Sequence, residues 1–440
     1  MNQGSQFHFC VNVPSSIMDE NPKKRVKQGL QYNTLLCAET TLQTTRNSKK
    51  CMSVSAKGTI WLLTMFLLVL MLPTVVHALD CGEFSYTVSG SKVTITKYNG
   101  PGGEVSIPDT LSCNGLSVTS IGSSAFKNCT TLTSVIIPDS VTGIGGYAFN
   151  GCSNLTSATL GNTVGTIESC AFQGCSKLLG IVIPDSVMYL GDQAFYQCNK
   201  LTNAMIGSGI THFGNYVFSG CTSLTTAEIG AFATEIGNYA FNGCINLETV
   251  EIPDGVTGIG GYAFNGCTSL TSATLSSTIG TIESCAFQGC SKLLGIVIPD
   301  SVTYLGDQAF YQCAKLASAL IGSGITHFGN SVFSGCTSLT TADIGAFATE
   351  IGDYAFNGCI NLETVEISDG VTGVGSSAFK NCTTLTSVII PDSVTGIGGY
   401  AFNGCSNLTS ATLGNTVGTI ESCAFQGCSK LLGIVIPDSV

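Results

Sequence analysis

The chain has 440 residues, of which 10% are charged and 44% hydrophobic, and it contains 53 glycines and 22 cysteines. This composition supplies enough apolar side chains for a large core and is not that of a disordered chain. The net charge of −11 argues against a surface that follows nucleic-acid phosphates, which requires clustered lysine and arginine. We therefore expect no nucleic-acid partner.

Charge is distributed unevenly along the chain. From Leu79 onward there are nine lysines, no arginine and 25 Asp or Glu residues, whereas residues 1–78 hold eight basic and three acidic residues. Arginine is the side chain that most often binds carboxylates and phosphates through two parallel hydrogen bonds. Its absence from the long acidic part argues against anionic small-molecule substrates.

The first predicted element is an apolar segment of 13 uncharged residues at 60–72. That length suits the core of a signal peptide better than a membrane-spanning helix. Val76-His77-Ala78 places small residues where a signal peptidase cleaves. Residues 52–78 are therefore predicted to be a signal peptide that starts at Met52, and the mature chain is expected to begin near Leu79.

The region before Met52 leaves two interpretations open. Residues 1–51 lack apolar periodicity and are either a leader or an upstream extension of the reading frame. If Met1 is the start, residues 52–78 form a signal anchor instead, with Lys49 and Lys50 on the inner side of the membrane. Both interpretations export the acidic part, so we expect a secreted or cell-surface protein whose only membrane contact is this possible anchor.

An internal repeat defines the architecture of the rest of the chain. A phenylalanine recurs every 23 residues from Phe126 to Phe425, fourteen times without an insertion. A cysteine follows each of them three residues later, from Cys129 to Cys428. Periods of 20 to 50 residues are typical of solenoids, in which each coil buries its core only against its neighbours.

One repeat unit predicts how a coil is built. Leu132, Val135 and Ile137 follow the spacing of a short strand with these side chains directed inward, and Pro138 ends that strand. Residues 141–145 form a second extended segment, and the following Ala-Phe-x-x-Cys suits a single helical turn. The sequence therefore predicts a β-rich solenoid of about fourteen coils with parallel strands.

The repeat resembles a known family. The segment LTSVIIPDSVTGIGGYAFNGC at 132–152 is similar to the BspA-type leucine-rich repeat, and the resemblance covers about 122–440. It implies a leucine-rich repeat protein that is secreted or displayed at the cell surface and adheres to host proteins or other cells.

The segment 79–121 is predicted to cap the first coil. Its alternating apolar residues surround Ser89-Gly90-Ser91, which is typical of a β-hairpin, and a degenerate coil with an insertion follows. Cys81 and Cys113 are the only cysteines after residue 78 that lie outside the repeats, so we expect them to form a disulfide in an oxidising compartment.

No matching cap is visible in the sequence at the other end. The last expected strand, Leu431 to Ile436, would present unpaired backbone groups and apolar side chains. Exposed edges of this kind pair with other chains, so self-association through the last coil is expected.

Duplication within the array argues against an enzyme. Residues 122–187 recur letter for letter at 375–440, and residues 146–256 recur nearly unchanged at 261–371. Almost every polar residue of the array therefore has a copy elsewhere, which fits poorly with a unique active site. No set of nucleophile, base and orienting group is visible, and we expect no catalytic residue and no cofactor.

Histidine and cysteine give no convincing site. His212 and His327 lie 115 residues apart, or five coils and about 24 Å, so they cannot share a metal or a proton, and a surface or packing role is expected. The repeated cysteines lack the paired Cys-x-x-Cys motifs of zinc sites, and we expect a row of buried thiols. Cys170, Cys285 and Cys423 are additional cysteines without an assigned role.

Acidic residues on the outward side of the long strands form the candidate binding face. They fall into two groups of three: Glu228, Glu248 and Glu251, then Asp343, Glu363 and Glu366. One interpretation is a solvated strand surface, and the other is a patch for a basic partner or for Ca²⁺. Ten other residues of the same row include Ile136, Val182 and Leu320, and an exposed apolar stripe favours a protein contact.

Four asparagines stand in Asn-x-Ser/Thr sequons: Asn128, Asn154, Asn381 and Asn407. They are candidate glycosylation sites only in a host that glycosylates, and a structural role in turns explains them as well.

From these features we expect an adhesion or recognition protein that binds an extracellular protein or glycoprotein through its repeated strand face. The alternative is a structural spacer that displays a domain encoded beyond Val440.

Overall fold

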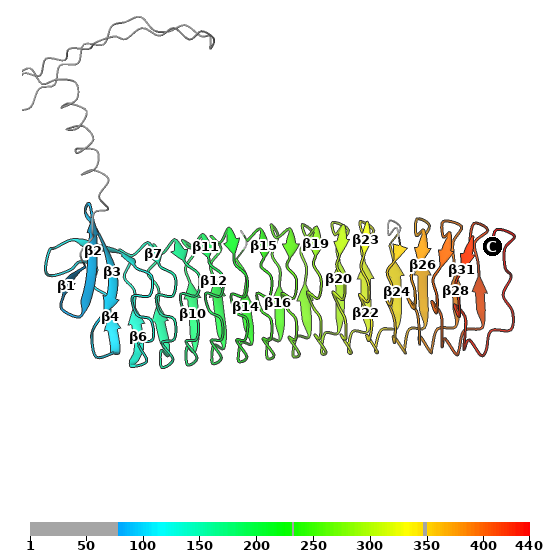
Figure 1. Cartoon of the computed structure of the whole chain (residues 1–440), viewed down its shortest axis with the longest axis horizontal. Coiled ribbons are helices and arrows are strands. Elements are labelled where there is room, and N and C mark those ends of the chain that lie inside the picture. Colours follow the sequence, from blue (N-terminus) through cyan, green and yellow to red (C-terminus); the bar gives the residue numbers. More distant parts are fainter. Residues whose placement is uncertain (1–77, 231–232, 346–349) are drawn as a thin grey trace, which may run out of the picture. The chain divides into compact units, whose positions relative to one another are not determined.

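The computed structural model describes residues 78–230, 233–345 and 350–440. Within these ranges it contains 31 strands and no helix. Consecutive coils lie side by side in a single row, and each coil contributes one strand to each of two faces (Figure 1). The predicted leader at 1–51 and the signal peptide or anchor at 52–78 lie outside the described residues except for Ala78.

The longer strand of each coil forms what we call the long-strand face. Neighbouring strands that pair on it are parallel and in register, one coil apart, and the pairing is interrupted at three places along the array. Its strands are β4 (Gly103–Ser106), β6 (Leu132–Ile136), β8 (Ser157–Thr159), β10 (Gly180–Ile183), β12 (Asn203–Ile206), β14 (Thr226–Glu228), β16 (Thr249–Glu251), β18 (Ser272–Thr274), β20 (Gly295–Ile298), β22 (Ser318–Ile321), β24 (Thr341–Ile344), β26 (Thr364–Ile367), β28 (Ser387–Ile389) and β30 (Ser410–Thr412).

The second extended segment of each coil forms the short-strand face, and its strands are also parallel. It comprises β5 (Ser117–Ile121), β7 (Gly143–Ile144), β9 (Thr166–Ile167), β11 (Tyr189–Leu190), β13 (His212–Phe213), β15 (Glu235–Ile236), β17 (Gly258–Ile259), β19 (Thr281–Ile282), β21 (Tyr304–Leu305), β23 (His327–Phe328), β25 (Glu350–Ile351), β27 (Gly373–Val374), β29 (Gly396–Ile397) and β31 (Thr419–Ile420). This architecture is the parallel solenoid that the repeat predicts.

The repeated phenylalanines form one continuous stack through the core. From Phe126 to Phe425 each ring lies 4.8 to 5.4 Å from the next, and each neighbouring pair is stacked. Leu132, Val135 and Ile137 are buried beneath the strand, as predicted. Because each ring is covered by the rings of the adjacent coils, no coil has a complete core by itself.

The segment around each phenylalanine is a run of tight turns and not the expected helical turn. The amide N–H of Cys152 donates to the carbonyl oxygen of Phe149, and that of Ala148 donates to Gly145. A helix cannot form because Tyr147 and Gly151, on either side of Phe149, have φ values of 59° and 73°. These left-handed residues reverse the chain within each coil.

The N-terminal strands extend the short-strand face. Strands β1 (Leu79–Cys81), β2 (Phe84–Ser89) and β3 (Lys92–Tyr98) are antiparallel to one another, and β3 pairs in parallel with β5. A disulfide joins Cys81 to Cys113, with their Cα atoms 5.9 Å apart. The ring of Tyr98 stacks on Phe126 at 5.0 Å, so this segment covers the first ring of the stack.

The last coil differs from its prediction. Residues 431–436 form no strand, because their backbone makes no ladder with β30, and Leu432 is 97% exposed. The expectation of a final strand at Leu431 to Ile436 is therefore wrong.

Across the three described ranges, we find no helix with the length and hydrophobicity that crossing a membrane requires.

Candidate functional site: the outward row of the long strands

One position of every coil projects from the long-strand face into solvent. We call these fourteen residues the outward row. Register pairs link those members whose strands share a sheet, as in Val182 with Met205, Met205 with Glu228, and Glu228 with Glu251. The row consists of Ile136, Thr159, Val182, Met205, Glu228, Glu251, Thr274, Val297, Leu320, Asp343, Glu366, Ile389 and Thr412, and of Val435 at the equivalent position of the last coil, which lies in no strand.

The outward row is exposed because strand residues alternate between the two sides of a sheet. Ile181 and Ile183 are buried, while Val182 between them is 59% exposed. The largest apolar members of the row are similarly open to solvent, since Leu320 is 59% and Ile389 is 68% exposed. Apolar side chains are therefore exposed at seven of the fourteen positions of the row, singly or in adjacent pairs.

The structure brings the predicted acidic residues together on this face. Glu228 is the register partner of Glu251, and Asp343 is the register partner of Glu366. Glu248 and Glu363 lie three residues before Glu251 and Glu366 in the same coils. All six are exposed. Like charges directly opposite each other on neighbouring strands are unfavourable, so these pairs reduce the stability of the sheet.

None of these six carboxylates accepts a hydrogen bond or forms an ion pair with another described residue. Other acidic residues do have a structural role. Asp185 and Asp300, each in a Pro-Asp turn, accept the backbone N–H of Ser208 and Ser323 in the next coil at 2.8 Å. The N–H and hydroxyl of Ser323 hold the pKa of Asp300 below its ordinary value. The outward acidic residues are thus not used to join the coils.

Shallow grooves follow the acidic and apolar parts of the row. One of about 680 Å³ is lined by Val182, Met205 and Glu228, among others. A second of about 470 Å³ includes Asp343, Glu366 and Ile389. Each groove therefore places a carboxylate beside an apolar side chain.

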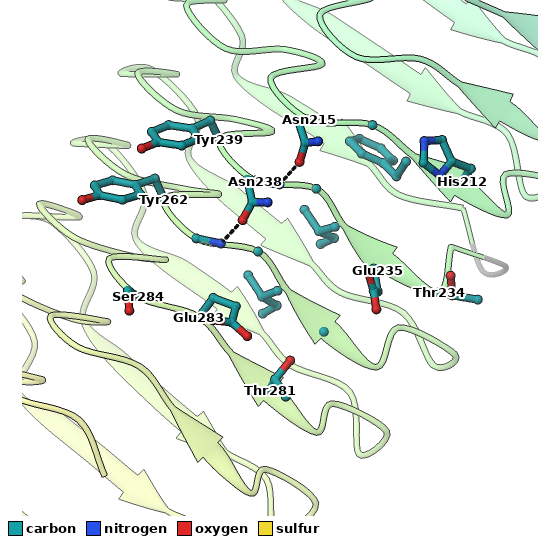
Figure 2. A pocket seen from close by; sticks show the side chains of 18 of the residues that line it. His212, Asn215, Thr234, Glu235, Asn238, Tyr239, Tyr262, Thr281, Glu283 and Ser284 are labelled. Carbon is teal, nitrogen blue, oxygen red and sulfur yellow. Dashed lines mark hydrogen bonds between the residues drawn. The ribbon is translucent and has the colours of Figure 1, made fainter. Parts of the chain in front are cut away.

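A third hollow lies on the opposite, short-strand face, and sequence reasoning did not identify it. It has a volume of about 690 Å³ and is lined by His212, Glu235 and Glu283, among others (Figure 2). Backbone to side-chain hydrogen bonds connect the lining: the N–H of Asn238 donates to the side-chain oxygen of Asn215 at 2.8 Å. The repeated Thr-His-Phe-Gly motif was the only sequence signal for this place.

The histidines have the surface role expected of them. The ring of His212 stacks on Tyr189 at 4.6 Å, and His327 stacks on Tyr304 at the same distance. No group of three or more His, Cys, Asp or Glu residues that could hold a metal ion was found in the described part of the chain. The structure therefore gives no support for a Ca²⁺ patch at the acidic residues.

The repeated cysteines are free thiols in the core. Thirteen of them, from Cys152 to Cys428, donate to the carbonyl oxygen of the phenylalanine 26 residues earlier, at 3.0 to 3.3 Å. Burial raises the pKa of Cys267 to about 12. A buried thiol with so high a pKa is a poor nucleophile and a poor metal ligand.

The three additional cysteines occupy one position of the coil. Cys170, Cys285 and Cys423 stand two residues before a repeated phenylalanine, with φ near 60°. A hydrogen bond with the thiol of Cys170 raises the pKa of Tyr147 in the preceding coil. These cysteines therefore lie outside the row of core thiols.

The sequon asparagines divide into two kinds. Asn128 and Asn381 are exposed and have φ values of 59° and 61°, so they act as left-handed turn residues. Asn154 and Asn407 are half-buried, and the amide of Asn154 donates to the carbonyl oxygen of Thr130 at 2.7 Å. Glycosylation of the four remains a prediction.

Two parallel faces, a continuous core stack and a repeat of 23 residues define a leucine-rich repeat solenoid. The family model of the BspA type leucine rich repeat region matches the chain at residues 110–225, 213–340 and 335–440. The chain belongs to this family, as the sequence motif indicated. No curated protein matches it.

Solved bacterial structures are similar to this chain. A leucine-rich repeat protein from Bacteroides ovatus ATCC 8483 is 29% identical, with a TM-score of 0.70 over 83% of this chain and 95% of that one. A leucine rich cell surface protein from Faecalibacterium prausnitzii A2-165 is 28% identical, with a TM-score of 0.40 over 81% of this chain and 94% of that one. The family and the fold are those of repeat scaffolds.

Proposed function

We propose that this protein is exported and recognises other macromolecules, in the first place proteins, through the outward row of its long strands. The observation that carries this proposal is the recurrence of exposed apolar side chains along the row, of which Val297 is 60% and Ile389 is 68% exposed. Exposed apolar patches rimmed by polar residues are typical of protein-contact sites. Adhesion at the cell surface is the function that the family resemblance implies.

Two observations support export. Disulfides persist in oxidising compartments, and Cys81 is bonded to Cys113. The apolar segment at 60–72 has the size of a signal-peptide core.

A binding experiment with matched variants tests the proposal. The full chain is immobilised and exposed to a panel of purified extracellular-matrix and serum proteins and to whole cells. A row variant carries Val182→Ser, Val297→Ser and Ile389→Ser. A control variant carries Met188→Ser, Ile245→Ser and Ile360→Ser, which remove exposed apolar side chains that lie outside the outward row.

We expect the row variant to weaken binding at least tenfold and the control variant to bind like the unmodified chain. Equal loss in both variants would contradict recognition through the row. A chain that binds no member of the panel would favour the alternative function, a structural spacer. The uninterrupted stack of phenylalanine rings from Phe126 to Phe425 would give such a spacer a continuous core.

A further inference from the structure

The outward row changes its chemistry in a fixed order that occurs twice. Two apolar coils are followed by two acidic coils, and a threonine coil separates the two occurrences. Including the residue three positions earlier in a coil, the first module consists of Leu179, Val182, Met205, Glu228, Glu248 and Glu251. The second consists of Leu294, Val297, Leu320, Asp343, Glu363 and Glu366.

Register fixes the geometry inside each module. Val182, Met205, Glu228 and Glu251 are successive register partners, so they are about 4.8 Å apart along the row. The centre of the apolar pair therefore lies about 10 Å from the centre of the acidic pair. In the first module a groove of about 680 Å³ is lined by Val182, Met205 and Glu228, so it runs from the apolar pair to the first acidic residue.

The apolar parts of the two modules are similarly open to solvent. Leu179 is 56% and Val182 is 59% exposed in the first module, against 59% for Leu294 and 60% for Val297 in the second. The replacement of Met205 by Leu320 and of Glu228 by Asp343 keeps the character of each position. The two surfaces are therefore equivalent in chemistry.

Charge indicates what each module would bind. Its three carboxylates have no partner within the described residues, and residues 79–440 contain no arginine and only nine lysines. A basic segment of another molecule is therefore complementary in charge to this acidic surface. An apolar surface directly beside them requires apolar groups on that same molecule, about 10 Å from its cations.

We propose that the two modules are equivalent docking sites, each for an extended polypeptide segment of another molecule. The segment presents apolar side chains, and lysine or arginine follows them about three residues further along. This inference rests on the proposed function and specifies its partner. The modules are five coils, or about 24 Å, apart, so a partner with two such segments at that spacing occupies both. Binding in two places raises the affinity by about 10²- to 10⁴-fold over one segment.

An unbiased peptide selection tests the chemistry of the segment. A displayed library of random 12-residue peptides is selected on the full chain and, in parallel, on a variant in which the six carboxylates are replaced by amides. We expect peptides selected only on the unmodified chain to combine apolar residues with lysine or arginine. Selected peptides that lack basic residues would overturn the proposal. So would a selection in which the variant binds every peptide that the unmodified chain binds.

Calorimetry with one selected peptide then tests the number of sites. We expect two peptides to bind per chain. One should bind to the variant Glu228→Gln, Glu248→Gln, Glu251→Gln, and two to the control variant Thr274→Ser. Two copies of the peptide joined by a Gly/Ser linker of about 20 residues should bind at least a hundredfold more tightly than one copy.

The outcomes separate this inference from the proposed function. One peptide per chain whose binding depends on the outward row would refute the two equivalent sites and leave recognition through the row intact. Binding that is insensitive to substitutions throughout the row would refute both.

Discussion

The thiol of Cys152 donates to the carbonyl oxygen of Phe126 in the preceding coil, with 3.0 Å between sulfur and oxygen. The same oxygen also accepts the backbone N–H of Cys129 at 3.0 Å. Each repeated cysteine from Cys152 onward therefore connects the core of its coil to the backbone of the coil before it. This link accounts for the fixed spacing of three residues between phenylalanine and cysteine.

Because of the buried thiols, the free energy of unfolding is expected to decrease at alkaline pH. Burial raises the pKa of Cys221, Cys267 and Cys313 to about 12, from an ordinary value of 9.0. The unfolded chain loses these protons near pH 9 while the folded chain keeps them, so the free energy of unfolding is unaffected by these thiols below pH 9 and falls above it. Each thiol contributes a slope of about 1.4 kcal/mol per pH unit.

Guanidinium unfolding between pH 7 and pH 10.5 measures this effect. We expect the midpoint to decrease above pH 9, and the decrease to be smaller in Cys267→Ala, which has one thiol fewer. A midpoint that is the same at pH 8 and pH 10.5 would show that the thiols are not buried.

The phenylalanine stack predicts the effect of a core substitution. Phe264 lies 5.2 Å from Phe241 and 5.1 Å from Phe287 and is fully buried. Phe264→Ala is expected to destabilise the array by about 3–5 kcal/mol, because it leaves a cavity between two rings. Thermal unfolding measures the loss, with Thr274→Ala on the exposed row as a control that should change the stability by less than about 0.5 kcal/mol. Equal melting temperatures for the two variants would contradict the stack.

The disulfide predicts a local effect at the N-terminal end. The bond between Cys81 and Cys113 closes a loop across 32 positions, which in the chain-entropy model stabilises the folded state by about 3–4 kcal/mol. Replacing both cysteines by serine should therefore speed amide hydrogen exchange in β1 to β5 and leave β17 unchanged. Peptide mapping without reductant should recover the two cysteines in one linked fragment. Two free thiols in that map would refute the pairing.

Most of the fold could be predicted because the same pattern of apolar residues recurs in fourteen coils. The inward positions of Leu132, Val135 and Phe149 follow from strand alternation and from the 23-residue period. The turns could not be predicted, because Tyr147 and Cys170 adopt positive φ without the glycine that usually signals it. A helical turn was therefore expected where successive reversals occur.

The candidate site was predicted in part for the same reason. Strand alternation placed Glu228 and Glu251 on one side of the sheet, and the period placed them in neighbouring coils. The grooves could not be predicted, because their depth depends on how the loops beside each strand lie. The hollow lined by His212 and Gly258 could not be predicted either, because its shape depends on the cross-section of the coil.

The expected export predicts the start of the mature chain. If Val76-His77-Ala78 is the cleavage site, N-terminal sequencing of secreted protein should begin near Leu79. Protein that stays with cells and still carries residues 1–51 would favour the signal anchor instead.

Methionine oxidation in a complex tests recognition through the outward row most directly, because the chain contains a matched pair. Met205 belongs to the outward row and is 48% exposed, whereas Met188 precedes β11 on the short-strand side and is 58% exposed. The full chain is oxidised by peroxide with and without a bound extracellular protein, and each methionine is followed by mass spectrometry. Recognition through the row predicts that the partner slows oxidation of Met205 and leaves Met188 at its free rate. Protection of Met188 with Met205 unchanged would contradict it.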